Sequence, residues 1–415
     1  MIMKLGFDIG TTTISCVVLE NNKVIDSKTV NNDSFICDTK TQDVDLIINK
    51  SLCLIHEFIS KYSIESIGLT GQMHGILYLN EKGKAISPLF TWQENCASSI
   101  IDEINQYTKH RVSSGYGLAT HISHIQKNLV PKDVKSICTI MDYFGMILTN
   151  RVMPLLHTSN AASLGFFDIE KNVFEKEILK KFEVDLDILP QVTSNIEQLG
   201  KYQNIPVYVA IGDNQASFLS TVGNNTNTVL VNMGTGGQIS LLTKNYVQFE
   251  GIETRPFINN QYLLVGASLC GGKAYALLEK FFREYVKEAT GIEISQYEVM
   301  ERLANKCDSN SLNIQTTFNG TRINPNQTGS ILNINEENLL PEFFINGFMV
   351  GMIDEIFEMY QKMKNQYISY LMASGNGLRK NKTLQKICEE KFQLPLKLAS
   401  EIEEAACGAA MSVEY

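Results

Sequence analysis

The stretch LGFDIGTTTISCVVLE, residues 5–20, places an acid inside an apolar run that then turns sharply. Asp8 lies near the end of the first run, and residues 10–13 form the turn. Residues 14–19 are mostly β-branched and apolar, so we predict a β-hairpin rather than a turn into a helix. Backbone N–H groups and threonine hydroxyls in such a turn can bind anions, and the carboxylate of Asp8 can hold Mg²⁺. An ordinary hairpin with a turn-capping aspartate is the alternative.

A second hairpin of the same kind begins the second half of the chain. Residues 230–242, LVNMGTGGQISLL, repeat the order of strand, Gly-Thr turn and strand, with Asn232 in the place of Asp8. Two such turns favour a duplicated domain with two phosphate-binding turns. Strand-like runs alternate with helical patterns along the rest of the chain, which indicates an α/β fold. We therefore expect two domains, 1–222 and 223–415.

The composition is that of a globular protein long enough to form two cores. The 415 residues are 44% hydrophobic and 20% charged, with a formal net charge of −9. The 36 Lys and Arg residues are scattered without interleaved aromatic residues, so we expect no nucleic-acid partner. No apolar run approaches the roughly 20 residues that span a bilayer, and the first residues do not resemble a signal peptide. We expect a cytoplasmic protein without a membrane partner.

The cysteine and histidine patterns predict no metal-binding framework. The nine cysteines are widely spread and include no C-x-x-C pair, which suits a reducing compartment. His121 and His124 are three residues apart but have no nearby Cys or carboxylate partner. We predict a solvated helix face there rather than a metal site. The chemistry of the protein must therefore rest on acids and glycines.

Two predicted strands end in glycine-flanked polar segments. Residues 66–70 form a buried strand that ends at GQMHG (71–75), a place typical of ligand-facing side chains. Core and surface roles for Met73 and His74 are the alternative. Residues 368–373 form a strand that breaks into SGNG (374–377), where a flat ring can approach the backbone closely. A plain loop is the alternative there.

A third strand leads directly to an acid. Residues 206–212 form this strand, Asp213 follows it, and a helical pattern begins within the next few residues. Aspartate is a good helix N-cap, so capping is one interpretation. A carboxylate placed at the end of a buried strand as a general base is the other.

Nine short motifs, in this order, resemble the FGGY family of carbohydrate kinases within the actin-like ATPase superfamily. The motifs are FDIGTT (7–12), GQMHG (71–75), TWQE (91–94), SNAASLGFFD (159–168), GDNQAS (212–217), NMGTGGQ (232–238), GASLCGG (266–272), ASGNGLRKN (373–381) and EEAACGAA (403–410). The resemblance covers essentially the whole chain. It implies two ribonuclease-H-like domains with an interdomain cleft, in which domain 1–222 binds the sugar and domain 223–415 binds the nucleotide.

The resemblance also implies roles for individual residues. Asp213 matches the family's catalytic base and Asp8 the acid near the metal and phosphates, so both are expected at Mg²⁺. The residues implied for ATP binding are Thr11, Thr12, Gly234, Thr235, Gly375, Asn376 and Gly377. The residues implied for sugar binding are Gln72, Met73, His74, Trp92, Glu94 and Asp213.

Two segments at the sugar end depart from the family's pattern. The family's Trp-x-Asp-x-Arg reads WQENC (92–96), so Glu94 replaces the aspartate and the arginine is missing. The family's Thr-Asp-x-Ser-x-Ala-Ser reads HTSNAAS (157–163), without its acid. These changes leave the ATP end unchanged and leave the choice of sugar open.

The reaction that the resemblance implies is ATP-dependent phosphorylation of a ketose hydroxyl, with Asp213 accepting the hydroxyl proton. The TWQ and SNAAS segments are most similar to the sedoheptulokinases, so sedoheptulose is expected before xylulose or ribulose. A sugar or nucleotide sensor that kept the fold and lost turnover is the alternative from another class. The intact Asp8, Asp213 and GTG turn oppose that alternative. A homodimer is the candidate assembly.

Overall fold

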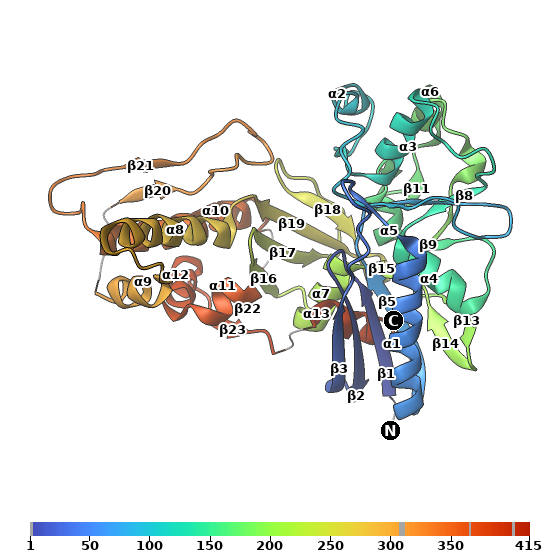
Figure 1. Cartoon of the computed structure of the whole chain (residues 1–415), viewed down its shortest axis with the longest axis horizontal. Helices are drawn as coiled ribbons and strands as arrows, with labels where there is room; N and C mark the ends of the chain where they lie inside the picture. The colour runs from blue at the N-terminus through green and yellow to red at the C-terminus, as the bar shows by residue number, and fades with distance from the viewer. Residues whose placement is uncertain (1–2, 307–311, 365–366, 401–402) are drawn as a thin grey trace. The chain divides into compact units, whose positions relative to one another are not determined.

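A computed structural model of the chain describes residues 3–306, 312–364, 367–400 and 403–415 (Figure 1). The chain folds into two units. Unit 1 comprises Met1–Gly223, Arg255–Gln261 and Glu401–Tyr415, and unit 2 comprises Asn224–Thr254 and Tyr262–Ser400. The sequence patterns divide the chain once, at residue 222. The structure instead assigns two later segments to unit 1.

Unit 1 contains fifteen described strands and eight described α-helices, and only one of these elements comes from the end of the chain. The strands are β1 (Met3–Ile9), β2 (Thr13–Glu20), β3 (Lys23–Asn31), β4 (Thr41–Gln42), β5 (Ile64–Gly71), β6 (Leu77–Leu79), β7 (Leu89–Phe90), β8 (Ser136–Cys138), β9 (Leu155–His157), β10 (Phe167–Asp168), β11 (Val173–Phe174), β12 (Gln191–Thr193), β13 (Gln198–Tyr202), β14 (Ile205–Tyr208) and β15 (Ile211–Gly212). The helices are α1 (Val44–Lys61), α2 (Ile101–Ile104), α3 (Gly117–Gln126), α4 (Ile140–Thr149), α5 (Thr158–Ser163), α6 (Lys176–Lys181), α7 (Asp213–Val222) and α13 (Glu404–Ser412).

The main sheet of unit 1 has the strand order β13-β14-β5-β1-β2-β3, with β15 also paired to β5. Strands β1, β2 and β3 are antiparallel neighbours, whereas β5 is parallel to both β1 and β14. The predicted hairpin of residues 5–20 is therefore confirmed, and it lies in the interior of the sheet. Asp8 is placed opposite Ser15 on one side and Thr70 on the other.

Helix α13 joins unit 1 through direct backbone contact. A Cβ atom on Gly6 would overlap the carbonyl oxygen of Ala406, and one on Gly68 would overlap the backbone of the same helix. A Cβ atom on Gly408 would overlap the carbonyl oxygen of Ala216 in α7. The small residues of α13 thus allow it to lie against β1, β5 and α7.

Unit 2 repeats this arrangement of strands. Its sheet has the order β18-β19-β17-β16-β22-β23, in which β16, β17 and β19 are antiparallel neighbours and β16, β22 and β23 are parallel. Both units therefore have the ribonuclease-H-like fold, and the predicted duplication is confirmed. The strands are β16 (Thr228–Met233), β17 (Gly237–Thr243), β18 (Glu253–Pro256, which runs into the segment of unit 1), β19 (Tyr262–Ser268), β20 (Asn313–Gln315), β21 (Ser330–Leu332), β22 (Tyr370–Ser374) and β23 (Leu396–Leu398). The helices are α8 (Gly271–Thr290), α9 (Tyr297–Ala304), α10 (Pro341–Met363), α11 (Gly375–Lys380) and α12 (Lys382–Phe392).

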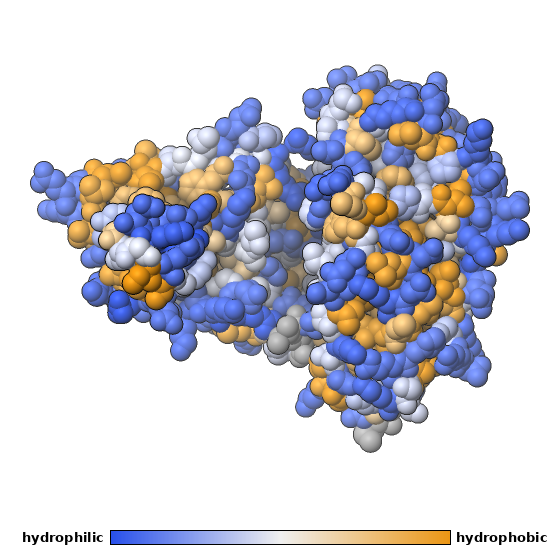
Figure 2. Space-filling model, viewed as in Figure 1, coloured by the Kyte–Doolittle hydropathy of each residue, from blue (hydrophilic) through white to orange (hydrophobic). Residues whose placement is uncertain are grey.

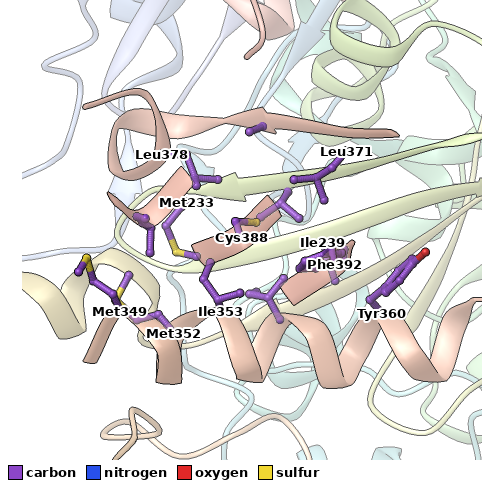
Figure 3. Close-up of a cluster of buried hydrophobic side chains, with 14 of the residues drawn as sticks. Met233, Ile239, Met349, Met352, Ile353, Tyr360, Leu371, Leu378, Cys388 and Phe392 are labelled. Atoms are coloured by element: carbon purple, nitrogen blue, oxygen red, sulfur yellow. The ribbon is translucent and has the colours of Figure 1, made fainter. Parts of the chain in front are cut away.

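The core of unit 2 lies between its sheet and helices α10 and α12. Figure 3 shows Ile353 of α10 near Met233 and Ile239 of the sheet, with Cys388 of α12 in the same cluster. Burial of this many apolar side chains is the main favourable term in folding. It holds β16 in place, so the Gly-Thr turn that follows Met233 starts from a fixed strand. Among the described residues, none of the helices combines the length and apolar character needed to cross a membrane.

Candidate active site

Asp8 is a half-buried acid at the end of β1. Its Oδ1 atom is buried and has no hydrogen-bond partner among the described residues. Burial, and then the negative charges of Asp213 and Glu403, raise the pKa of Asp8 to about 8. Mg²⁺ prefers oxygen ligands and is commonly held by one or two carboxylates. A carboxylate oxygen without a partner, in the field of two further negative charges, is suited to bind such a cation.

Two buried side chains hold the turn after β1, and the sequence patterns single out neither. Asn32 donates from Nδ2 to the carbonyl oxygen of Gly10 (2.8 Å), and its backbone N–H donates to that of Thr12 (2.8 Å). Gln42 donates from Nε2 to the carbonyl oxygen of Thr11 (2.8 Å). Both side chains are fully buried. Three consecutive carbonyl groups of the turn are therefore fixed from outside the hairpin.

A chain of hydrogen bonds connects this turn to two of the predicted sugar-binding residues. The indole Nε1 of Trp92 donates to Thr11 Oγ1 (3.0 Å), and Thr11 Oγ1 donates to Gln72 Oε1 (3.1 Å). Gln72 Nε2 then donates to Gln42 Oε1 (2.8 Å). Thr11 consequently links the predicted nucleotide turn with the predicted sugar side. Trp92 is still 49% exposed.

Met73 and His74 follow β5 as predicted, and they differ in environment. Met73 is buried, and a Cβ atom on Gly212 would fall 2.6 Å from its sulfur. His74 has a φ of +74°, which is rare for a residue other than glycine. Its Nδ1 lies 2.8 Å from the carbonyl oxygen of Ser163, and its ring stacks on Tyr116 with centroids 4.4 Å apart.

The contact of His74 with Ser163 places a proton on Nδ1, because a carbonyl oxygen only accepts. Strained conformations held by surrounding contacts cluster at functional sites. The geometry of His74 therefore agrees with a ligand-contacting role.

Asp213 is the first residue of α7 and directly follows β15. The N-cap of α7 is Gly212, so the structure does not use the Asp213 side chain as the helix cap. Its Oδ1 accepts the N–H of Asn214 (2.6 Å). Burial raises the pKa of Asp213 to about 6, although the Asn214 hydrogen bond and the charge of Arg255 act in the opposite direction. A carboxylate with this pKa is mostly ionised at neutral pH and can accept a proton.

Arg255 is a functional candidate that the sequence patterns do not reveal. Burial lowers its pKa, while Tyr116 and Asp213 act to raise it. Its segment is held on α7, because Gln215 Nε2 donates to the carbonyl oxygen of Pro256 (3.0 Å). No local pattern identifies this residue, since it precedes a short connection between two strands of the other unit.

Glu403 is a third acid close to Asp8. It immediately precedes α13, and its charge contributes to the raised pKa of Asp8. Negative charge is favoured near the N-terminus of a helix, and both Asp213 and Glu403 occupy such positions. Within the described parts of the chain, no three His, Cys, Asp or Glu side chains are arranged as a ready metal site. A bound Mg²⁺ would therefore need phosphate oxygens and water for its remaining positions.

Glu94 orders the loop in which the sequence departs from the family. Its Oε1 accepts the N–H groups of Asn95 (2.9 Å) and Cys96 (3.2 Å). The carbonyl oxygen of Cys96 accepts hydrogen bonds from Ser123 Oγ (2.8 Å) and Lys127 Nζ (3.0 Å). One oxygen of Glu94 is thus used within the loop, and sugar binding by this residue stays a prediction.

The prediction of a solvated helix face at His121 and His124 is wrong. Both side chains are buried in α3, and Nδ1 of each lies 2.9 Å from the hydroxyl of Tyr78. Burial, and then the charge of His124, lower the pKa of His121 to about 4. Phe90 covers His124 edge-on with ring centroids 4.5 Å apart. The pair belongs to a buried polar network because strands β6 and β7 cover this face of the helix.

In unit 2 the second Gly-Thr turn is held by the first turn of α8. The carbonyl oxygen of Gly234 accepts the N–H of Gly272 (3.0 Å), and that of Thr235 accepts the N–H of Lys273 (2.9 Å). Asn232, the counterpart of Asp8, donates from Nδ2 to Ser374 Oγ (2.8 Å). The duplicated hairpin thus keeps its turn but replaces the acid with a neutral hydrogen-bonding group.

The predicted glycine break at residues 374–377 is the start of helix α11 rather than a plain loop. Gly375 has a φ of +82°, and a Cβ atom on it or on Gly377 would fall within 3 Å of the Met233 carbonyl oxygen. Asn376 between them is exposed. The residues predicted for nucleotide binding in this unit therefore gather around the end of β16, whereas Thr11 and Thr12 belong to unit 1.

Comparisons with known proteins agree along the whole chain. Residues 3–230 match the N-terminal domain of the FGGY family of carbohydrate kinases, and residues 229–413 match its C-terminal domain. Sedoheptulokinase from Mus musculus is 28% identical, over 98% of this chain and 96% of that protein. Xylulose kinase from Staphylococcus xylosus is 23% identical, over 98% and 89%. The crystal structure of xylulose kinase from Rhodospirillum rubrum has the same fold, with a TM-score of 0.87 at 16% identity over 99% of this chain and 89% of that one.

Proposed function

Because the chain belongs to the FGGY family of carbohydrate kinases and is an ATP-dependent sugar kinase, we propose that its acceptor is a ketose, namely sedoheptulose, and its product sedoheptulose 7-phosphate. The similarity to a sedoheptulokinase over nearly the full length of both chains supports this acceptor. Xylulose or ribulose is the second candidate, supported by the lower identity to a xylulose kinase.

The observation that carries the proposed mechanism is the carboxylate of Asp213 at the end of β15. Its pKa of about 6 leaves it ionised at neutral pH, so it can accept the proton of the attacking sugar hydroxyl. Phosphoryl transfer has a loose transition state with little covalent work for the protein. Positioning of the two reactants and neutralisation of phosphate charge are therefore the main tasks of the other residues.

The remaining roles at the ATP end follow from the two turns. In this proposal the turn with Thr11 and Thr12 and the turn with Gly234 and Thr235 donate to phosphate oxygens. Residues 375–377 would lie against the adenosine, since glycines allow close backbone approach. Asp8, with Asp213, would hold Mg²⁺, which when bound neutralises phosphate charge.

The sugar end offers a buried acceptor and a partly exposed tryptophan. The Oδ1 atom of Asn214 is buried without a partner among the described residues. It could accept a hydrogen bond from a sugar hydroxyl, with Gln72, Met73, His74 and Trp92 completing the wall. Sites built to pair with hydroxyl groups reject analogues that lack them.

A coupled ADP-release assay with a panel of ketoses tests the proposal. At fixed Mg²⁺ and ATP, we expect kcat/KM for sedoheptulose to exceed that for xylulose and ribulose by at least about tenfold, or roughly 1.4 kcal/mol. Asp213→Asn is the matched control, because it should abolish release from the same preparation. A higher kcat/KM for xylulose or ribulose would overturn the proposed acceptor while leaving the family unchanged.

A further inference from the structure

Strand β15 leads directly into Asp213 and is too short to be held by strand pairing alone. It contains only Ile211 and Gly212, and β5 is the one strand paired with it in the part of the chain that the structure describes. A strand of two residues can form few backbone hydrogen bonds with its neighbour. Buried backbone groups need partners, and side chains of β5 and of helix α5 supply them here.

Thr70 holds Ile211 from the side of β5. Its Oγ1 donates to the carbonyl oxygen of Ile211 (2.7 Å). In the strand pairing, Thr70 lies opposite Ile211 on one side and opposite Asp8 on the other. Both Thr70 and Ile211 are at most 1% exposed. The hydroxyl of Thr70 thus bonds to the residue two positions before Asp213, in a place that bulk water does not reach.

Helix α5 holds the residues on either side of Ile211. Asn160 donates from Nδ2 to the carbonyl oxygen of Ala210 (3.1 Å). The N–H of Gly212 donates to Ser159 Oγ (3.1 Å). Figure 2 shows many hydrophilic residues on the surface of unit 1, whereas the side chains of Asn160 and Ser159 are buried beneath it. Three successive residues are therefore each bonded to a buried side chain.

His157 fixes the direction of the Ser159 hydroxyl. The backbone N–H of Ser159 donates to His157 Nδ1 (3.2 Å), so this nitrogen carries no proton. Ser159 Oγ lies 2.9 Å from the same nitrogen and can bond to it only by donating its own proton. The oxygen of Ser159 is then left to accept the N–H of Gly212. These residues belong to the segment 157–163, in which the sequence departs from the family's pattern.

The position of Gly212 sets that of Asp213. Gly212 is the N-cap of α7 and Asp213 is the first residue of the helix, so the two are consecutive in the backbone. An aspartate side chain is short, and its carboxylate follows its backbone closely. Gly212 has little room to shift, because a Cβ atom there would fall 2.6 Å from the sulfur of Met73. A displacement of residues 210–212 would therefore move the carboxylate of Asp213.

We propose that Thr70, Ser159 and Asn160 are positioning residues that hold residues 210–212 and thereby place the Asp213 carboxylate for proton transfer. Their role rests on the proposed role of Asp213 as the general base and not on which ketose is phosphorylated. A misplacement of about 1 Å at a reacting group can lower the rate about 100-fold. Loss of one of these hydrogen bonds should therefore lower kcat although the carboxylate itself is still present.

Two substitutions of Thr70 separate the effect of its hydroxyl from that of its size. Thr70→Val keeps the number of non-hydrogen atoms but leaves the buried carbonyl oxygen of Ile211 without its side-chain partner. Its kcat should fall about 10- to 100-fold, with a KM for ATP within about twofold of the wild type. Thr70→Ser keeps the hydroxyl and should recover most of the kcat. Steady-state kinetics with Mg²⁺, ATP and the ketose that gives the highest kcat/KM provide the measurement.

Thr149→Val is the matched control for loss of a threonine hydroxyl. Thr149 Oγ1 donates to the carbonyl oxygen of Gly145, also at 2.7 Å, but does so within α4. This variant should keep the wild-type kcat even where its unfolding temperature falls. Thermal unfolding of every variant, recorded beside the kinetics, separates a positioning role from a loss of stability.

Ser159→Ala tests the contact from α5 and decides the matter if Thr70→Val does not fold. It removes the acceptor of the Gly212 N–H, so kcat should fall as it does in Thr70→Val. In both variants the loss of activity as the pH falls through about 6 should remain, because Asp213 is still the base. A merely structural role for these side chains would leave the kcat of the folded enzyme unchanged.

The Asp213→Asn enzyme, measured in parallel, distinguishes the two ways in which the proposal can fail. A Thr70→Val kcat within about twofold of the wild type, beside an inactive Asp213→Asn enzyme, would overturn the positioning role alone. Equal losses of kcat in Thr70→Val and Thr70→Ser would do the same. An Asp213→Asn enzyme that keeps more than about a tenth of the wild-type kcat would overturn the general base, and the positioning role with it.

Discussion

Replacement of Asp213 by asparagine is the most direct test of the proposed base. The substitution keeps the size of the side chain, and the asparagine Oδ1 can still accept the Asn214 N–H that Asp213 accepts at 2.6 Å. The start of α7 should therefore stay intact. The negative charge near Asp8 and Arg255 is lost, and with it the ability to accept a proton.

The expected loss appears in kcat. A positioned general base contributes about 10² to 10⁴ in rate, which is roughly 3–5 kcal/mol of transition-state stabilisation. The wild type should lose activity as the pH falls through about 6, because protonation of Asp213 removes the acceptor. The residual activity of the Asp213→Asn variant should not show this fall at acidic pH. The KM for ATP should change little, since the turns that bind phosphate are unaltered.

Steady-state kinetics from pH 5 to 8, for the sugar and for ATP separately, provide the measurement. Asp142→Asn is a matched control, because Asp142 is also a buried aspartate of unit 1 but bonds to Thr139 and Asn160 (2.6 and 3.2 Å). That variant should keep the wild-type kcat. An Asp213→Asn enzyme with more than about a tenth of the wild-type kcat would refute the reasoning, because that ratio is far above the range for loss of a base.

Three further predictions concern the surroundings of the site. Gln42→Leu leaves the carbonyl oxygen of Thr11 and the amide of Gln72 without their Gln42 partners. The free energy of unfolding, measured by urea denaturation, should therefore fall by roughly 2–4 kcal/mol. A loss below about 1 kcal/mol would contradict the role of Gln42 in holding the turn. Burial raises the pKa of Asp142 to about 7, so the native state binds this proton more tightly than the unfolded chain does. The stability that comes from binding the proton is lost as the pH rises from about 4 to 7. The stability of Asp142→Asn relative to the wild type should therefore increase over that range in parallel denaturation curves. Asp8→Ala should weaken the use of Mg²⁺ and ATP and be partly rescued by more Mg²⁺, whereas an unchanged Mg²⁺ dependence would show that Asp8 only serves the turn.

Several features of the fold could be predicted because their signals are local. The hairpins at residues 5–20 and 230–242 each consist of two apolar runs around a glycine turn, and such a pattern needs no distant partner to be recognised. The sequence also predicts Asp213 between a strand and a helix, and it lies there. The burial of His121 and His124 was missed, because periodicity shows which face of a helix is apolar and cannot show how many neighbours cover the other faces.

The sequence by itself thus determined that the chain has two hairpin-led α/β halves, with an acid beside one turn and a second acid at a strand end. Only the tertiary structure decided what surrounds those acids. Asn32, Gln42, Arg255 and Glu403 reach the site from segments far apart in the chain, through strand register and the packing of α13 against Gly6. The same packing places the last helix in unit 1. The physical reason is that hydrogen bonds and charge interactions depend on distance in space, whereas a sequence pattern records only distance along the chain.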